Sequence, residues 1–522
     1  MRPTPRIALS RFALSAALAL LGLSGAPVFS QESPAQRLLD QVATAMGGRD
    51  RLQRVETLVY TGFGQDAYMD GGGNITADLN APTKWRAIAD AQRSIDLRSR
   101  RALVQQRRAP MFPFAAPFGL NWNRASSQQG AADLLDHPLP AVLAALDPAT
   151  KLGAISVEEG QPVLQFTTAE GVSVLMGVDA VTHLPAWTRR VVPHANLGDV
   201  AVTALFTGYI PQDGVQLPYG LVNRIDWRGQ VTLMLQVDSY RLNVARDQMP
   251  AIPSVPAPAP AAAASPPAAA PAVTVTPLAK GAWDLRVGNN NGGPVIEFAD
   301  HLVLFEANGS AAATLARIDA ANKLVPGKQV TQLIVTHHHF DHTAGLRAAV
   351  SRGLAVVSHR GNEAIFREMI TRPAVQYPDD LARSPHPLVF TPVDEKLVLE
   401  DKTQRLEIYH VLGHSHMANA VFAYLPAARI MMEGDLGDAE WTWHWWASAL
   451  KANIKAYGID PRLNVAVHGP NGGLSIEATL ANNQRQLRAA QDFCAKQTAA
   501  GVPVFGCPVQ YDTEGAISLV PR

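Results

Sequence analysis

Four side chains that can bind metal ions fall within six consecutive positions of the segment THHHFDH, namely His337, His339, Asp341 and His342. Alternate side chains of an extended segment point to the same side, so His337 and His339 can share one metal ion while His338 points away. Asp341 and His342 follow the strand end, where the chain can turn and offer ligands to a second ion. Imidazole nitrogens and a carboxylate suit zinc, and also iron or manganese.

The elements around this motif indicate a layered α/β fold. A short apolar strand over 332–335 leads into the motif, as expected when both faces of a strand are buried, and a helix begins at Leu346. Upstream, 294–298 and 301–306 are predicted to be paired strands, and 311–324 a helix. This alternation of strands and helices is typical of layered α/β architecture, which would hold the motif on a rigid scaffold.

The chain of 522 residues is expected to have four parts. Residues 1–30 are predicted to be a signal peptide, 33–248 a β-rich N-terminal domain, 249–275 a linker, and 276–522 the α/β domain with the histidine motif. The linker contains the run PAIPSVPAPAPAAAASPPAAAP. Proline and alanine offer no side chains with which to build a core, so this run predicts a semi-extended spacer.

The first residues of the chain indicate export. Arg2, Arg6 and Arg11 form a positive region, an apolar run follows over 12–23, and small residues precede an expected cleavage site before Gln31. The apolar run is shorter than the roughly 20 residues that span a bilayer, although an uncleaved anchor is the alternative. The mature protein is therefore expected in the periplasm or outside the cell, with no stable membrane span.

Charge and composition narrow the classes of partner. Lys+Arg and Asp+Glu both number 45, so the formal net charge is zero, which disfavours a nucleic-acid partner. We therefore expect a small-molecule substrate, and the sequence leaves the oligomeric state open. The cysteines are Cys494 and Cys507. A disulfide between them is expected in an oxidising compartment, with two buried free thiols as the alternative.

The N-terminal domain is predicted to be mainly antiparallel β structure. It opens with a helical pattern that ends at Gly47-Gly48, and strand patterns follow over 57–62, 163–168, 172–178, 200–206 and 231–240. The pattern distantly resembles the half-barrels that carry lipoproteins or lipids. We find no catalytic constellation in this domain.

The histidine motif, the strand before it and the residues downstream resemble the metallo-β-lactamase superfamily over nearly all of 276–522. The resemblance implies an αβ/βα sandwich with metal ions at the edge of its two sheets. It also implies three further ligands, for which the sequence offers His416, Asp435 and His468. His414 is the alternative to His416, or a residue that supports the ligands.

Transferred residue by residue, the resemblance implies two metal ions, most simply two zinc ions. The first would be held by His337, His339 and His416. The second would be held by Asp341, His342 and His468, with Asp435 bridging both. A metal-bridging hydroxide would then attack a carbonyl carbon, and Asp341 would orient it and accept a proton. The expected enzyme is an exported metal-dependent hydrolase of an ester, lactone, thioester or amide.

Asp435 also bears on the substrate. True β-lactamases of the superfamily usually have Cys or Ser at the corresponding position, so an acid resembles the glyoxalase-II-like and lactonase-like branches and leaves β-lactam hydrolysis as a side activity. Trp441, Trp443 and Trp445 follow Asp435 and could line an apolar substrate pocket, or pack in the core. The competing functions are a mononuclear iron enzyme resembling persulfide dioxygenases, and a ligand-binding module whose metal site is structural.

Overall fold

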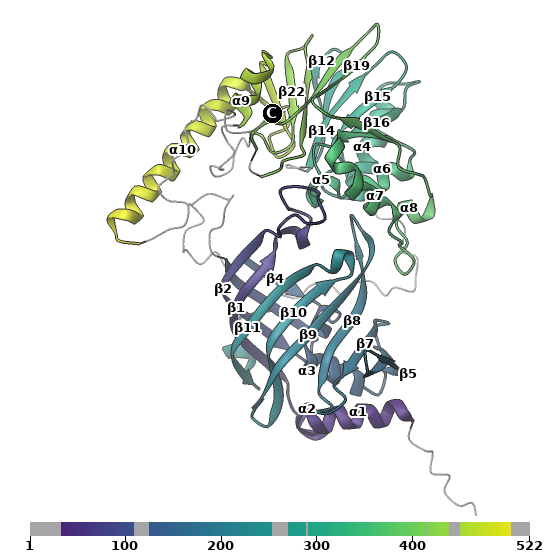
Figure 1. Ribbon diagram of the computed structural model, residues 1–522, viewed down its shortest axis with the longest axis vertical. Coiled ribbons are helices and arrows are strands. Elements are labelled where there is room, and N and C mark those ends of the chain that lie inside the picture. Colours follow the sequence, from purple (N-terminus) through teal and green to yellow (C-terminus); the bar gives the residue numbers. More distant parts are fainter. Residues whose placement is uncertain are drawn as a thin grey trace, which may run out of the picture.

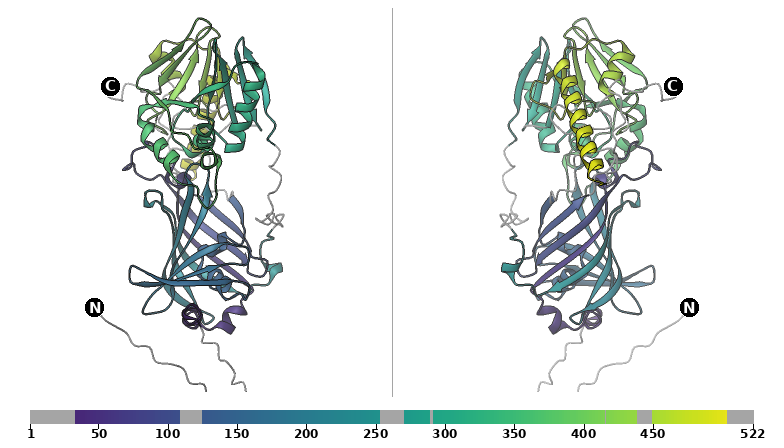
Figure 2. Two further views of the ribbon diagram at one scale, coloured as in Figure 1. Left: turned by 90° about the vertical axis from the view of Figure 1, so that its right-hand side faces the viewer. Right: turned by 90° about the vertical axis from the view of Figure 1, so that its left-hand side faces the viewer.

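The computed structural model places an N-terminal sheet below a C-terminal two-sheet sandwich, and the two parts are in contact (Figures 1 and 2). It describes residues 33–108, 125–252, 270–288, 291–414, 416–437 and 449–502. The predicted signal peptide, most of the predicted linker, Trp441, Trp443 and Trp445 lie outside these residues. The predicted boundaries of the parts remain predictions.

The N-terminal part is one antiparallel sheet of 11 strands, in the order β4-β3-β2-β1-β11-β10-β9-β8-β7-β6-β5. The sheet is strongly curved (Figure 2). Its strands are β1 (Thr57–Ala67), β2 (Trp85–Asp96), β3 (Arg101–Arg108), β4 (Ala125–Gln129), β5 (Lys151–Glu158), β6 (Gln161–Thr167), β7 (Ser173–Val178), β8 (Pro185–His194), β9 (Gly198–Gln212), β10 (Val215–Ile225) and β11 (Val231–Leu242).

Helices fill one face of this sheet. They are α1 (Pro34–Ala45), α2 (Arg49–Gln53) and α3 (Pro138–Leu146). The helical pattern predicted at the start of this part is confirmed in α1, whose N-cap Ser33 accepts a hydrogen bond from the backbone of Gln36. Leu39 and Val42 of α1 join Leu139 of α3 in the hydrophobic core beneath the strands. Two of the helices therefore share a core with the strands of this sheet.

The C-terminal part has two sheets. The first, in the order β12 to β18, comprises β12 (Thr274–Ala279), β13 (Ala282–Val287), β14 (Asn291–Glu297), β15 (Leu302–Phe305), β16 (Val330–Ile334), β17 (Ala355–His359) and β18 (Phe390–Val393). The second, in the order β19 to β24, comprises β19 (Lys396–Glu400), β20 (Arg405–His410), β21 (Val421–Leu425), β22 (Ile430–Glu433), β23 (Leu463–Ala466) and β24 (Leu474–Ser475).

The two sheets pack face to face and carry helices on their outer faces, which confirms the predicted sandwich. Phe305 of the first sheet and Ile408 and Met432 of the second belong to one core between the sheets. The helices are α4 (Ala311–Leu324), α5 (Phe340–Thr343), α6 (Leu346–Ser351), α7 (Glu363–Thr371), α8 (Asp380–Arg383), α9 (Ala449–Tyr457) and α10 (Ile476–Ala499). The predicted helix over 311–324 is confirmed in α4, and the predicted strand pair in β14 and β15.

A hydrophobic core continues across the junction between the two parts. Trp227 and Leu197 of the N-terminal part belong to the same buried cluster as Phe340 and Leu346 of the C-terminal part. The indole of Trp227 also donates to Glu368 at 3.0 Å, and Arg228 donates to the same carboxylate at 2.7 and 2.9 Å. The two parts are therefore fixed against each other by apolar packing and by charged hydrogen bonds.

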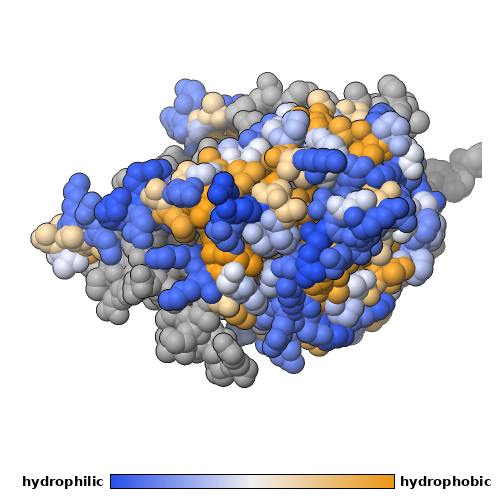
Figure 3. Space-filling model, turned by 90° about the horizontal axis from the view of Figure 1, so that it is seen from above, coloured by the Kyte–Doolittle hydropathy of each residue, from blue (hydrophilic) through white to orange (hydrophobic). Residues whose placement is uncertain are grey.

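No described helix is both long enough and apolar enough to cross a bilayer. Seen from the C-terminal end, hydrophobic residues lie in separate patches between hydrophilic ones (Figure 3). Cys494 of α10 is disulfide-bonded, and Cys507 lies outside the described residues.

Candidate metal centre

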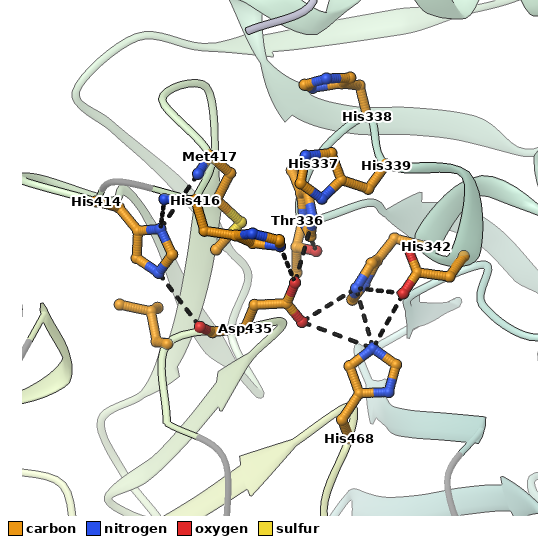
Figure 4. A network of polar contacts seen from close by, with 12 residues as sticks. Thr336, His337, His338, His339, His342, His414, His416, Met417, Asp435 and His468 are labelled. Atoms are coloured by element: carbon orange, nitrogen blue, oxygen red, sulfur yellow. Dashed lines mark hydrogen bonds and ion pairs between the residues drawn. The ribbon is translucent and has the colours of Figure 1, made fainter. Parts of the chain in front are cut away.

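Strand ends of the sandwich bring the predicted ligands together at one edge (Figure 4). The histidine motif follows β16 and enters α5, while His416 lies in the connection between β20 and β21. Asp435 follows β22, and His468 follows β23. Between Glu433 and Asp435 a glycine is required for space, because a Cβ on Gly434 would lie 2.6 Å from Oγ1 of Thr336.

The predicted ligands form two groups. His337, His339, His416 and Asp435 make the first, with ligand atoms all within 4.8 Å of one another. Asp341, His342 and His468 make the second by the same measure. The structure thus brings together all seven residues for which ligation was predicted, and the histidines divide between the two groups as predicted.

Asp435 lies between the two groups. Its Oδ2 is 3.0 Å from Nε2 of His416 and 3.5 Å from Nε2 of His337. Its Oδ1 is 3.1 Å from Nε2 of His342 and 3.6 Å from Nε2 of His468. Each oxygen of one carboxylate faces a different set of histidines, which is the arrangement that a bridging ligand requires.

The hydrogen bonds of the histidines leave one ring nitrogen free to bind a metal ion. Thr336 Oγ1 donates to Glu306 at 2.6 Å, so at 3.0 Å it accepts from Nδ1 of His337, whose Nε2 is left unprotonated. Nδ1 of His342 lies 3.3 Å from the same Glu306 carboxylate, which likewise leaves its Nε2 facing Asp435. Proteins commonly orient a histidine ligand in this way, by a hydrogen bond to the ring nitrogen that does not bind the metal ion.

The charges of the centre fit a cation. Nε2 of His337 and Oδ1 of Asp341 are buried and have no hydrogen-bond partner among the described residues. Burial alone would lower the pKa of His342, but the carboxylates of Asp435 and Asp341 outweigh it and raise that pKa well above its usual value. In the first group, by contrast, burial lowers the pKa of His337, His339 and His416 and keeps these rings neutral, as metal ligands must be. Neutral imidazoles, carboxylates and atoms without a hydrogen-bond partner suit metal ions of the zinc, iron or manganese type.

His414 does not join either group. Its Nδ1 accepts backbone N–H groups of His416 at 3.2 Å and Met417 at 3.3 Å, and its Nε2 donates to the backbone oxygen of Asp435 at 3.2 Å. Both ring nitrogens are therefore used in holding the two ligand-bearing segments together. The geometry favours His416 as the ligand and gives His414 a supporting position. His338 points away from the other motif histidines, as predicted (Figure 4).

Glu306 is a site residue that the sequence analysis missed. Its side chain is fully buried, and it holds both Thr336 and His342. Its backbone φ of 74° lies in the left-handed region, which costs roughly 1–3 kcal/mol for a non-glycine residue and persists only where the surroundings impose it. One feature of the sequence could have indicated this residue. Glu306 is an acidic residue that directly follows the apolar run LVLF, and this strand ends at the same sheet edge as the histidine motif.

Glu306→Gln is expected to weaken metal binding by roughly 10–100-fold, because the amide has no charge with which to hold His342 and its NH₂ group would face the backbone N–H of Thr336, which donates to the other oxygen of Glu306 at 3.4 Å. Competition with a chromogenic chelator measures this affinity. Glu363→Gln, which removes a carboxylate from a surface pair with Arg367, is the matched control. An unchanged affinity in Glu306→Gln would contradict the supporting role of this carboxylate.

Two further contacts at the centre come from the N-terminal part. The backbone oxygen of Asn74 accepts from Nε2 of His339 at 2.9 Å, and Nζ of Lys84 donates to the backbone oxygen of His416 at 2.9 Å. Burial lowers the pKa of Lys84 to about 7, against the opposing charge of Asp435. These contacts join residues more than 260 positions apart, so nothing near Asn74 or Lys84 in the sequence points to them.

Comparison with known proteins found one family model and several solved structures that match this chain. Residues 295–437 match the family model described as the metallo-beta-lactamase superfamily. Similar solved structures include a metallo-beta-lactamase from Pontibacter korlensis, with 20% identity and a TM-score of 0.32 over 41% of this chain and 100% of that one. FIM-1 from Pseudomonas aeruginosa, in its mono-zinc form, has 18% identity and a TM-score of 0.32 over 42% of this chain and 96% of that one.

Both solved structures are only distantly similar to this chain. No curated protein matches the chain. The family match covers the histidine motif, His416 and Asp435, which are the residues that the structure brings to one point. The match to the metallo-β-lactamase superfamily is therefore a property of residues 295–437 in the C-terminal half.

Proposed function

We propose that the protein is a dinuclear metal-dependent hydrolase that cleaves an ester, lactone, thioester or amide bond of a small molecule. The match to the superfamily and the two groups of ligand-type residues support a metal-dependent hydrolase. The observation that carries the dinuclear form is Asp435, whose two oxygens face His416 on one side and His342 on the other.

The chain's own residues supply positioning and proton transfer. When bound, two metal ions acidify water and polarise a carbonyl oxygen. Asp341 would orient the attacking water and accept its proton, and its Oδ2 lies 3.4 Å from Nε2 of His468. Its neighbours His342 and His468 hold the pKa of this carboxyl below its usual value, despite burial that would raise it. The side chain of Asp341 is therefore ionised and can accept a proton.

The substrate class and the location rest on the sequence. An acid at Asp435 resembles the glyoxalase-II-like and lactonase-like branches, so esters, lactones and thioesters are proposed ahead of β-lactams. The arginines and apolar run at the start of the chain support export to the periplasm or beyond, with signal cleavage before Gln31. A formal net charge of zero supports a small-molecule substrate over nucleic acid.

A chelator-controlled hydrolysis screen tests this function. The purified mature protein is assayed against lactones, thioesters, carboxylic esters, amides, β-lactams and phosphoesters, as isolated, after chelator treatment, and after reloading with zinc, iron or manganese. We expect turnover of a carbonyl substrate that the chelator abolishes and that two equivalents of metal restore. Turnover that survives removal of all metal contradicts the proposal, and one iron per chain with oxygen consumption favours the oxygenase alternative instead.

A further inference from the structure

We infer that the loop joining β1 and β2, residues 68–84, is a working part of the metal centre and that Asn74 is its positioning residue. The inference rests on the proposed metal centre and assigns a role to the N-terminal part of the chain. The loop begins with the short turn η1 (Tyr68–Gly71), in which Met69 and Asp70 have positive φ, and rises from the N-terminal sheet to the sandwich beside α5 (Figure 1).

The first step is the contact between Asn74 and His339. A backbone carbonyl can only accept, so at 2.9 Å the oxygen of Asn74 requires Nε2 of His339 to carry the proton. The other ring nitrogen, Nδ1, is then the unprotonated one that can bind a metal ion. The loop therefore selects both the tautomer and the orientation of one ligand of the first group.

The second step is the side chain of the same residue, which keeps the loop in shape. Oδ1 of Asn74 accepts the backbone N–H of Lys84 at 3.1 Å, and Nδ2 donates to the backbone oxygen of Ala81 at 3.4 Å. Asn74 is 8% exposed, so these bonds are largely shielded from water. The asparagine side chain thus closes the loop, and its own carbonyl is thereby held against His339.

The third step is a pair of contacts to the segment that carries His416. Nζ of Lys84 donates to the backbone oxygen of His416 at 2.9 Å, and the backbone oxygen of Ile75 accepts from the N–H of Ala418 at 2.7 Å. Tyr68 of the same loop stacks edge-on to the rings of His339 and His416, with centroids 6.4 Å away in each case. All of these contacts fall on His339 or on the segment of His416, and both histidines belong to the first group.

Close packing against the histidine motif fixes the position of the loop. A Cβ on Gly72 would lie 2.4 Å from the ring of Phe340, so only glycine lets the loop approach so closely. Asn196 of the N-terminal part donates to the backbone oxygen of Phe340 at 2.9 Å and to Oγ1 of Thr343 at 2.7 Å. The loop therefore meets a motif that is itself anchored to the N-terminal part.

The test uses the full chain and Co²⁺, whose absorption bands report the ligand geometry. Asn74→Ala opens the loop and is expected to weaken the binding of one Co²⁺ by roughly 10–100-fold and to change its visible spectrum, while the second Co²⁺ binds as before. Asn74→Asp keeps the acceptor for the Lys84 amide and is expected to restore most of the affinity. Asn243→Ala is the matched control, because Asn243 accepts the N–H of Glu56 at 2.8 Å in the same N-terminal part.

A second variant keeps the inference testable if Asn74→Ala does not fold. Lys84→Met retains the methylene chain and removes the donor to His416, and it is expected to weaken the same Co²⁺ site. Folded variants at both positions that bind both ions with unchanged affinity and spectrum overturn the inference, even if the wild type binds two. Failure of the wild-type chain to bind any Co²⁺ instead refutes the proposed function, and the inference with it.

Discussion

Asp435→Asn is expected to bind fewer than two metal ions and to lose turnover by roughly 10³-fold or more. The substitution preserves size but removes the charge that both groups of histidines share, since Oδ2 faces His416 at 3.0 Å and Oδ1 faces His342 at 3.1 Å. A tenfold loss corresponds to about 1.4 kcal/mol, and a metal that polarises the substrate contributes several kcal/mol. Metal analysis and turnover are measured on the same preparation.

The matched control for this prediction is Asp394→Asn. Asp394 pairs with Arg360 at 2.6 Å on the surface of the same half, where its side chain is 64% exposed. That variant should retain both metal ions and full turnover, because exposed pairs contribute little to stability. Two tightly bound metal ions in Asp435→Asn would show that Asp435 is not the bridge.

Arg286→Met is expected to destabilise the protein by about 3–5 kcal/mol and to loosen His468. The guanidinium is fully buried, pairs with Asp284 at 2.7 Å, and donates to the backbone oxygens of Ala466, Val467 and Gly469 at 2.7, 2.9 and 2.9 Å. Its removal leaves a buried carboxylate without its partner, which is the costly case for buried ion pairs. Denaturant unfolding measures the loss, and metal titration reports the displacement of His468.

A double variant separates the two effects of Arg286. Asp284→Asn combined with Arg286→Met removes the unpaired charge and should recover part of the lost stability, while the three carbonyls beside His468 still lack their donor. Arg360→Met, at the exposed pair with Asp394, should change stability by less than about 1 kcal/mol. If Arg286→Met lowered the free energy of unfolding as little as Arg360→Met does, the anchoring role of Arg286 would be contradicted.

Local pattern was sufficient to predict a layered α/β fold and the histidine motif, and the family resemblance added the two-sheet sandwich. The apolar strand before His337 and the two-residue period of His337 and His339 are properties of a few adjacent residues, and adjacent residues determine where a strand ends and which side chains share a face. The α4 helix follows from the same kind of information. Asp435 and His468 were predicted because the family resemblance implied further ligands, and each of them follows an apolar strand.

Contacts between distant segments could not be predicted in this way. The choice between His414 and His416 depended on which ring was already occupied by backbone groups, and this is fixed by packing rather than by spacing. Arg286 resembles an ordinary strand residue until its three carbonyl partners, some 180 positions away, are known. The role of Asn74 depends on how two separately patterned parts of the chain meet.

The central claim is that two metal ions lie on either side of Asp435. Anomalous diffraction at the zinc edge, from crystals of the full chain grown with zinc, tests it most directly. We expect two peaks, one among His337, His339 and His416 and the other among Asp341, His342 and His468, with the Asp435 carboxylate between them. Zinc-loaded crystals with no peak beside Asp435, or with their peaks at other residues, would contradict the account.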